Sequence, residues 1–274
     1  MSPSGAKTRS SSVWGIVRKL LDLCFVLEVL EPGLLVIKYS RGEAFGKFGN
    51  VAVLEGGEVK LVDEAFANRP DCPQVLSSIF GFDPDQPWFS EANIHIRLAA
   101  SIRTHGHGGL MLIVPAGQER WRDSISWPTP YVATPAFSRL AELTRRTSSA
   151  EPGPGRELEL HRAIDGVAGL TAVDGATVMN RHHEVLAFGA MVRRSDESRS
   201  VGRLLLTEPV VGNVASIVDP SVVGHSRHLA AAQFVHDQPD ALALVASQDG
   251  RFTVFAWSDA DELVRAHRID ALLL

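Results

Sequence analysis

The sequence predicts an α/β fold in which helices flank a central mixed β-sheet, preceded by an N-terminal α+β subdomain. Two compact apolar runs, at 110–114 and 242–246, have the length and composition of buried strands. Segments with helical character accompany them, at 91–105, 135–146, 157–168 and 230–235. This mixture of helical and strand-like segments indicates a domain that spans residues 91–274.

Residues 1–90 precede this domain. The serine-rich residues 1–12 predict a disordered tail, and residues 13–90 are expected to form the N-terminal subdomain. Apolar residues from Ile16 to Leu27 fit one face of an amphipathic helix within residues 13–35. Strands are predicted at 34–39, 51–54 and 59–62, with the Glu55-Gly56-Gly57-Glu58 turn joining the last two.

The bulk composition argues against some classes of function. With 45% hydrophobic and 22% charged residues among 274, the chain has the composition of an ordinary globular protein. Its formal charge of -5 argues against a general nucleic-acid-binding surface but not against a basic pocket for one nucleotide. Cys24 and Cys72 lack metal-ligand spacing, and charged residues interrupt the apolar stretch 13–35. We therefore expect a cytoplasmic protein with reduced thiols and no membrane span.

The first candidate motif is Asp174-Gly175-Ala176-Thr177. Apolar and β-branched flanks at 170–173 and 177–179 predict a strand-turn-strand unit around it. An isolated Asp-Gly pair is most often a simple hairpin turn. A carboxylate at a glycine turn can also hold a divalent cation or polarise a hydroxyl, because glycine lets a ligand approach the backbone.

The second motif, Ser226-Arg227-His228, follows Gly224 and His225 and precedes the alanine-rich helix predicted at 230–235. A hydroxyl, a guanidinium and an imidazole would there join the free N–H groups at the positive end of a helix dipole. That arrangement suits a triphosphate. Taken singly, Arg227 would instead be read as a surface ion-pair partner and His228 as a hydrogen-bonded core residue.

The third motif, Ser247-Gln248-Asp249-Gly250, joins the predicted strand 242–246 to an alternating segment at 251–257. A tight β-turn with Asp-Gly at its centre explains this motif almost as well as a ligand-binding role.

The order of these motifs resembles the diadenylate cyclase (DAC) domain family. Members of that family carry Asp-Gly-Ala, then Gly-Thr-Arg-His-Arg-Ala-Ala entering a helix, then a strand that ends in Ser-Glu-Glu. The resemblance covers roughly the last two thirds of the chain, and it is closest to a divergent branch, DACNV, described as a sensor domain. Three motifs in order, each in its expected setting, make a fairly specific signal.

The resemblance implies a DAC-like nucleotide-binding domain that condenses two ATP molecules into cyclic di-AMP with Mg²⁺ or Mn²⁺. It assigns catalytic roles to Asp174, Arg227 and His228, with Asp174 also as the metal ligand. The implied nucleotide contacts are Gly175, Ala176, Thr177, Gly224, Ser226, Leu229, Ser247, Gln248 and Asp249. Each protomer of the family holds one ATP, so a homodimer or larger homo-oligomer is expected.

Departures from the family pattern leave two further functions open. Leu229 replaces the second arginine, Gln248-Asp249 replaces two glutamates, and His225 is inserted after Gly224. Loss of one preorganised cation can remove several kcal/mol of transition-state stabilisation while ligand binding persists. A catalytically silent sensor of a nucleotide or cyclic dinucleotide is therefore the main alternative, and a scaffold with a decayed pocket is another.

Overall fold

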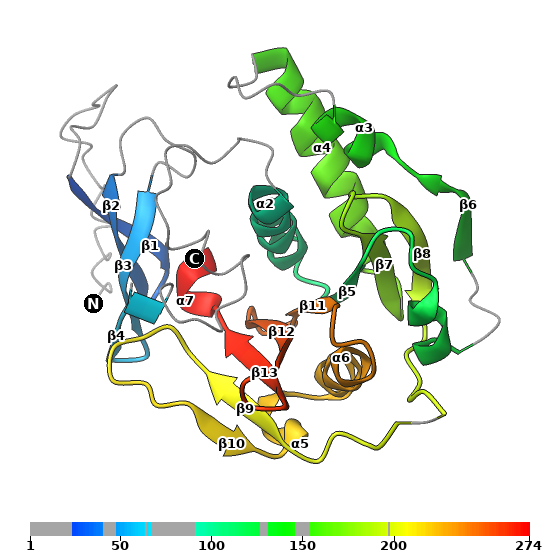
Figure 1. Cartoon of the computed structure of the whole chain (residues 1–274). Coiled ribbons are helices and arrows are strands. Elements are labelled where there is room, and N and C mark those ends of the chain that lie inside the picture. The colour runs from blue at the N-terminus through cyan, green and yellow to red at the C-terminus, as the bar shows by residue number, and fades with distance from the viewer. Residues whose placement is uncertain are drawn as a thin grey trace, which may run out of the picture.

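The computed structural model describes residues 24–40, 48–63, 65–66, 91–126, 131–145, 154–196 and 198–274. These residues form a four-stranded sheet near the N-terminus and a nine-stranded sheet in the remainder of the chain (Figure 1). The predicted tail 1–12 and the predicted subdomain boundary near residue 90 lie outside the described residues.

The smaller sheet is an antiparallel meander in which each strand pairs with the next. Its strands are β1 (Phe25–Glu31), β2 (Leu34–Ser40), β3 (Phe48–Glu55) and β4 (Glu58–Leu61). The predicted turn between β3 and β4 is confirmed, with Gly56 and Gly57 at φ of 58° and 89°. The amphipathic helix predicted within 13–35 is wrong from Phe25 onward, because that segment forms a full ladder with β2. Residues 13–23 lie outside the described part of the chain.

The larger sheet has the strand order β10-β9-β13-β12-β11-β5-β7-β8-β6. Its strands are β5 (Gly109–Val114), β6 (Tyr131–Phe137), β7 (Ala176–Asn180), β8 (Val185–Ala190), β9 (Leu204–Thr207), β10 (Ser216–Val218), β11 (Leu242–Ala246), β12 (Phe252–Ser258) and β13 (Leu263–Arg268). The pairs β5–β7 and β13–β9 are parallel and the others antiparallel. The predicted α/β class with a mixed sheet is thus confirmed.

The helices are α2 (Glu91–Thr104), α3 (Arg139–Arg145), α4 (Pro154–Leu170), α5 (Pro220–Val223), α6 (Ser226–Asp237) and α7 (Asp270–Leu273), with a short 3₁₀ turn, η2 (Arg120–Ser124). The helices predicted at 91–105, 157–168 and 230–235 correspond to α2, α4 and α6.

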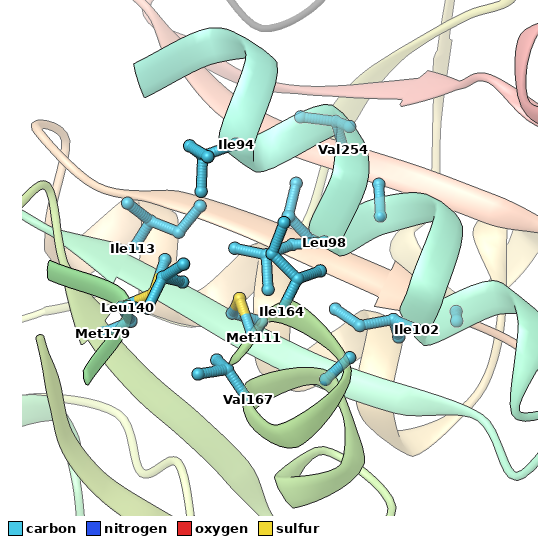
Figure 2. Close-up of a cluster of buried hydrophobic side chains, with 14 of the residues drawn as sticks. Ile94, Leu98, Ile102, Met111, Ile113, Leu140, Ile164, Val167, Met179 and Val254 are labelled. Atoms are coloured by element: carbon cyan, nitrogen blue, oxygen red, sulfur yellow. The ribbon is translucent and has the colours of Figure 1, made fainter. Parts of the chain in front are cut away.

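Helices cover both faces of the larger sheet, with α2 and α4 on one face and α6 on the other (Figure 1). Alternate residues of β5 therefore enter different cores: Met111 packs towards α2 and α4, whereas Leu112 packs towards α6. Figure 2 shows the first core, where Ile94, Leu98 and Ile102 of α2 meet Met111 and neighbouring strands. Burial on both faces explains why β5 and β11 read as continuous apolar runs.

Two segments differ from the predicted secondary structure. The helix predicted at 135–146 begins only at Arg139, because residues 131–137 form β6, an edge strand where a proline is tolerated. The strand-turn-strand unit predicted around Asp174 is a helix-turn-strand unit. Helix α4 continues to Leu170, whose side chain packs against the first core, and the turn precedes β7.

The two sheets contact each other partly through the C-terminal residues. Val36 and Val53 of the meander pack against Ala271 of α7. The Asn50 side-chain amide donates to the Ala271 carbonyl at 2.8 Å and to the Leu274 carbonyl at 3.2 Å. The meander is therefore joined to the end of the chain and, through β4 and residues 61–63, to the segment 208–211.

Candidate functional site

The three predicted motifs meet around the side chain of Arg227. Asp174, in the turn between α4 and β7, places its carboxylate Oδ1 3.9 Å from Arg227 Nη2. A Cβ atom added at Gly108, between α2 and β5, would lie 2.8 Å from Arg227 Nη1 and 3.4 Å from Gln248 Cγ. Segments distant in sequence thus enclose one guanidinium group, and glycine at position 108 leaves room for it.

A pocket of about 290 Å³ lies beside this cluster, lined by residues 223–228 and 246–249 and by Arg251. It contains every residue predicted from the second and third motifs except Leu229. Asp174 of the first motif does not line the pocket. Its side chain is fully exposed and adjoins the pocket by its contact with Arg227. The pocket is therefore a joint product of the start of α6 and the β11–β12 turn.

The start of α6 gives the pocket backbone donors. Its N-cap residue, His225, makes no side-chain capping hydrogen bond. The first N–H groups of a helix have no intrahelical acceptor, and they lie at the positive end of the helix dipole. Because residues 225–228 line the pocket, it has the local character of an anion site.

Two guanidinium groups add positive charge to the pocket, from Arg227 and Arg251. Arg251 Nε lies 3.5 Å from Asp249 Oδ2, and both side chains are more than half exposed. The sequence analysis missed Arg251. Its position directly after the Asp249-Gly250 turn is the signal that could have identified it, because a residue that follows a pocket-forming turn shares its location.

His228 is buried and contributes no charge. Burial lowers its pKa to about 4, and the nearby Arg268 charge acts in the same direction. Its ring meets the Phe255 ring edge-on, with centroids 6.1 Å apart. A Cβ atom at Gly224 would lie only 2.3 Å from His228 Nδ1, so the close approach of the ring requires glycine there. A neutral imidazole can donate or accept a hydrogen bond with a ligand.

The Ser247–Gly250 turn holds Asp249 ionised. Burial alone would raise the pKa of Asp249, but hydrogen bonds from Ser247 and from the Arg251 backbone N–H, together with the Arg251 charge, lower it overall. The turn itself is closed by a hydrogen bond of 2.9 Å from the Ser247 N–H to the Arg251 carbonyl. Asp249 therefore stabilises the turn, and its negative charge partly offsets the positive charge of Arg251 at the pocket.

Other predicted contacts lie away from the pocket. Ala176 and Thr177 are fully buried at the start of β7, so their side chains face the interior. Gly175, with a φ of +101°, packs against the backbone of Gly189, where an added Cβ would lie 2.5 Å from the Gly189 carbonyl carbon. Leu229 is 42% exposed and does not line the pocket. Of the first motif, Asp174 is thus the residue whose side chain approaches the other two.

A metal at Asp174 would take most of its ligands from water and from a bound molecule. Over the described residues, no group of three or more His, Cys, Asp or Glu side chains is arranged to hold a metal ion. Mg²⁺ commonly takes one or two carboxylates and fills its remaining positions with water and substrate phosphates. A single exposed carboxylate beside an anion pocket fits that kind of site.

Comparisons with known proteins add little to this geometry. No protein-family model and no curated protein matches the sequence. The structure aligns with a protein described as "the hypothetical membrane spanning protein from Bacillus cereus" at a TM-score of 0.37 and 14% identity, over 70% of this chain and 71% of that one. A TM-score this low shows neither a common fold nor a common function. Among the helices that the structure describes, none has the length and apolar character to cross a bilayer.

Proposed function

We propose that this chain binds an adenine nucleotide through its phosphates in the pocket at the start of α6. As a homodimer, it would condense two ATP molecules into cyclic di-AMP. The observation that supports the proposal most is the convergence on Arg227. The guanidinium lies between the Asp174 carboxylate and the Gly108 backbone, beside a pocket that has helix N–H donors and a second guanidinium.

The pocket residues divide the task of binding a triphosphate. The N–H groups at the start of α6 and the Ser226 hydroxyl would donate to phosphate oxygens, while Arg227 and Arg251 offset their charge. Neutral His228 would add a directional hydrogen bond without adding charge. The choice of adenine as the base follows from the sequence resemblance to the diadenylate cyclase family.

Asp174 would act on the reacting groups of the bound nucleotide. Its exposed carboxylate would hold Mg²⁺ or Mn²⁺, which when bound neutralises phosphate charge and orients the α-phosphate. In the reaction, each ribose 3′-oxygen forms a bond to the α-phosphorus of the other ATP, the bond to pyrophosphate breaks, and the hydroxyl proton is released. Because each protomer holds one ATP, a strict monomer cannot complete the reaction.

The second candidate function is a catalytically silent sensor of a nucleotide or cyclic dinucleotide. The observation that favours it is Leu229 itself, which stands where the resembling family has an arginine and leaves the start of α6 without that second cation. The single exposed carboxylate at Asp174 is also compatible with binding that needs no metal. A sensor would keep its affinity when Asp174 is changed, whereas a cyclase would lose turnover.

The test is incubation of the purified chain with ATP and Mn²⁺, with products separated by chromatography and identified by mass spectrometry. Asp174→Asn is the variant for turnover, and Arg227→Ala is the variant for binding. A cyclase makes cyclic di-AMP only with Asp174 present. A sensor makes none but is thermally stabilised by ATP or by cyclic di-AMP, through Arg227. Absence of both product and stabilisation would overturn the proposal and leave the scaffold reading.

A further inference from the structure

An exposed aromatic pair lies next to the Asp174 turn. Tyr131, the first residue of edge strand β6, pairs in register with Phe188 of β8. The two rings are stacked with centroids 4.7 Å apart and an interplanar angle of 3°. Tyr131 is nevertheless 50% exposed. A large ring that is held parallel on a second ring and remains half exposed is a rigid surface suited to stacking.

One glycine joins this pair to the candidate site. A Cβ atom added at Gly189 would lie 3.0 Å from Tyr131 Cδ2 and 3.5 Å from the Asp174 carbonyl oxygen. Gly189 therefore lies between the Tyr131 ring and the Asp174 backbone. Because the Asp174 carboxylate reaches Arg227, contacts run from the pocket through Arg227, Asp174 and Gly189 to Tyr131.

The order of these contacts matches the order of groups in a nucleoside triphosphate. The phosphates lie at one end of the ribose and the base at the other. A molecule with its phosphates at the start of α6 and its ribose near Asp174 would direct its base towards β6 and β8. Aromatic side chains bind bases through their π-faces, with a contribution that is large for a single contact.

We infer that Tyr131, supported by Phe188, is the stacking surface for the purine base of the bound nucleotide. This inference rests on the proposed nucleotide function. It gives a binding surface to the base, which the phosphate pocket does not reach. Gly189 has a matching role, because a side chain there would press on the Tyr131 ring and would strain a backbone whose φ is +64°.

The test compares two ligands on variants of β6. Isothermal titration calorimetry with Mg²⁺ would measure binding of 3′-deoxyATP, which lacks the attacking hydroxyl, and of inorganic tripolyphosphate, which lacks the base. Tyr131→Leu keeps apolar contact with Phe188 but removes the ring, and it should weaken 3′-deoxyATP binding roughly 5- to 150-fold. Its affinity for tripolyphosphate should not change, which also shows that the pocket is folded.

Two further variants control for the strand. Tyr131→Phe keeps the ring and should bind 3′-deoxyATP more tightly than Tyr131→Leu does. Phe137→Leu changes another exposed aromatic of β6, at the far end of the strand, and should leave both affinities at the wild-type value. If Tyr131→Leu binds 3′-deoxyATP as well as wild type, or loses both ligands equally, stacking at Tyr131 is refuted and the proposed function stands. If wild type binds neither ligand, the proposed function fails, and the inference fails with it.

Discussion

Acid should destabilise this protein through two buried histidines that face each other. His95 of α2 and His183, in the β7–β8 turn, have ring centroids 5.7 Å apart in an edge-to-face arrangement. Within the described chain, the Nε2 atom of each ring has no hydrogen-bond partner, while His183 Nδ1 contacts the Thr144 hydroxyl at 3.2 Å. Burial lowers the pKa of His95 to about 3 and that of His183 to about 4, and the neighbouring charges of His183, Arg181 and His182 act in the same direction.

The sign and size of the effect follow from these values. In the unfolded chain both imidazoles take up protons near pH 6.5, whereas in the folded chain they stay neutral until about pH 4 or lower. Their contribution to stability is therefore complete above pH 6.5 and is lost progressively as the pH falls towards the folded values. A pH of 5 is about 1.5 units below the unfolded pKa of each histidine. Each histidine therefore contributes about 2 kcal/mol less to the free energy of unfolding at pH 5 than at neutral pH.

Urea unfolding followed by circular dichroism at pH 7.5 and pH 5 tests this reasoning. The wild-type free energy of unfolding should fall by about 4 kcal/mol from these two residues, with carboxylate contributions added. His95→Phe should make that fall smaller by about 2 kcal/mol. His161→Asn changes an exposed histidine of α4 whose charge does not act on this pair, and it should leave the fall close to the wild-type value. An equal fall in wild type and His95→Phe would refute the assignment.

Two further predictions concern packing. Gly224→Ala places a methyl group against the His228 ring and should cost roughly 1–3 kcal/mol of stability in urea unfolding, whereas Gly202→Ala, with open space around it, should cost little; equal losses would contradict the close contact. Asp237→Ala removes a buried carboxylate that accepts hydrogen bonds from Ser195 and Ser198 of the loop 193–203. We expect the free energy of unfolding to fall by roughly 1–3 kcal/mol and trypsin to cleave that loop faster. Unchanged cleavage would show that the carboxylate does not hold the loop.

Local signals predicted much of the fold. The strands at β5 and β11 were predictable because both faces of each strand are buried, which makes the sequence continuously apolar. The β6 segment was not, because Pro135 is also common at the first turn of a helix, and only the edge position of the strand explains it. Residues 170–173 were assigned to a strand because a short apolar and β-branched run does not distinguish the end of a helix from a strand.

The candidate site was predictable motif by motif, but its assembly was not. The start of α6 and the turn after β11 each have a local signature in the sequence. Contact between Arg227 and Gly108 depends on the β5–β11 pairing, which brings together segments that have no local relation. The exposed stacking of Tyr131 on Phe188 likewise depends on the β6–β8 register. Non-local pairing of this kind leaves no periodic pattern for sequence reasoning to detect.

The strand order also affects how the chain can be made. On one side β5 pairs with β11. Nearly half of the chain separates the two strands in sequence, so β11 is synthesised much later than β5. Until then, one edge of an entirely apolar strand has no hydrogen-bonding partner, although β7 can already pair with its other edge. Unpaired apolar edges favour intermolecular association. We therefore expect nascent chains that stop before β11 to aggregate or to require a chaperone, and folding to finish only after β11 has left the ribosome.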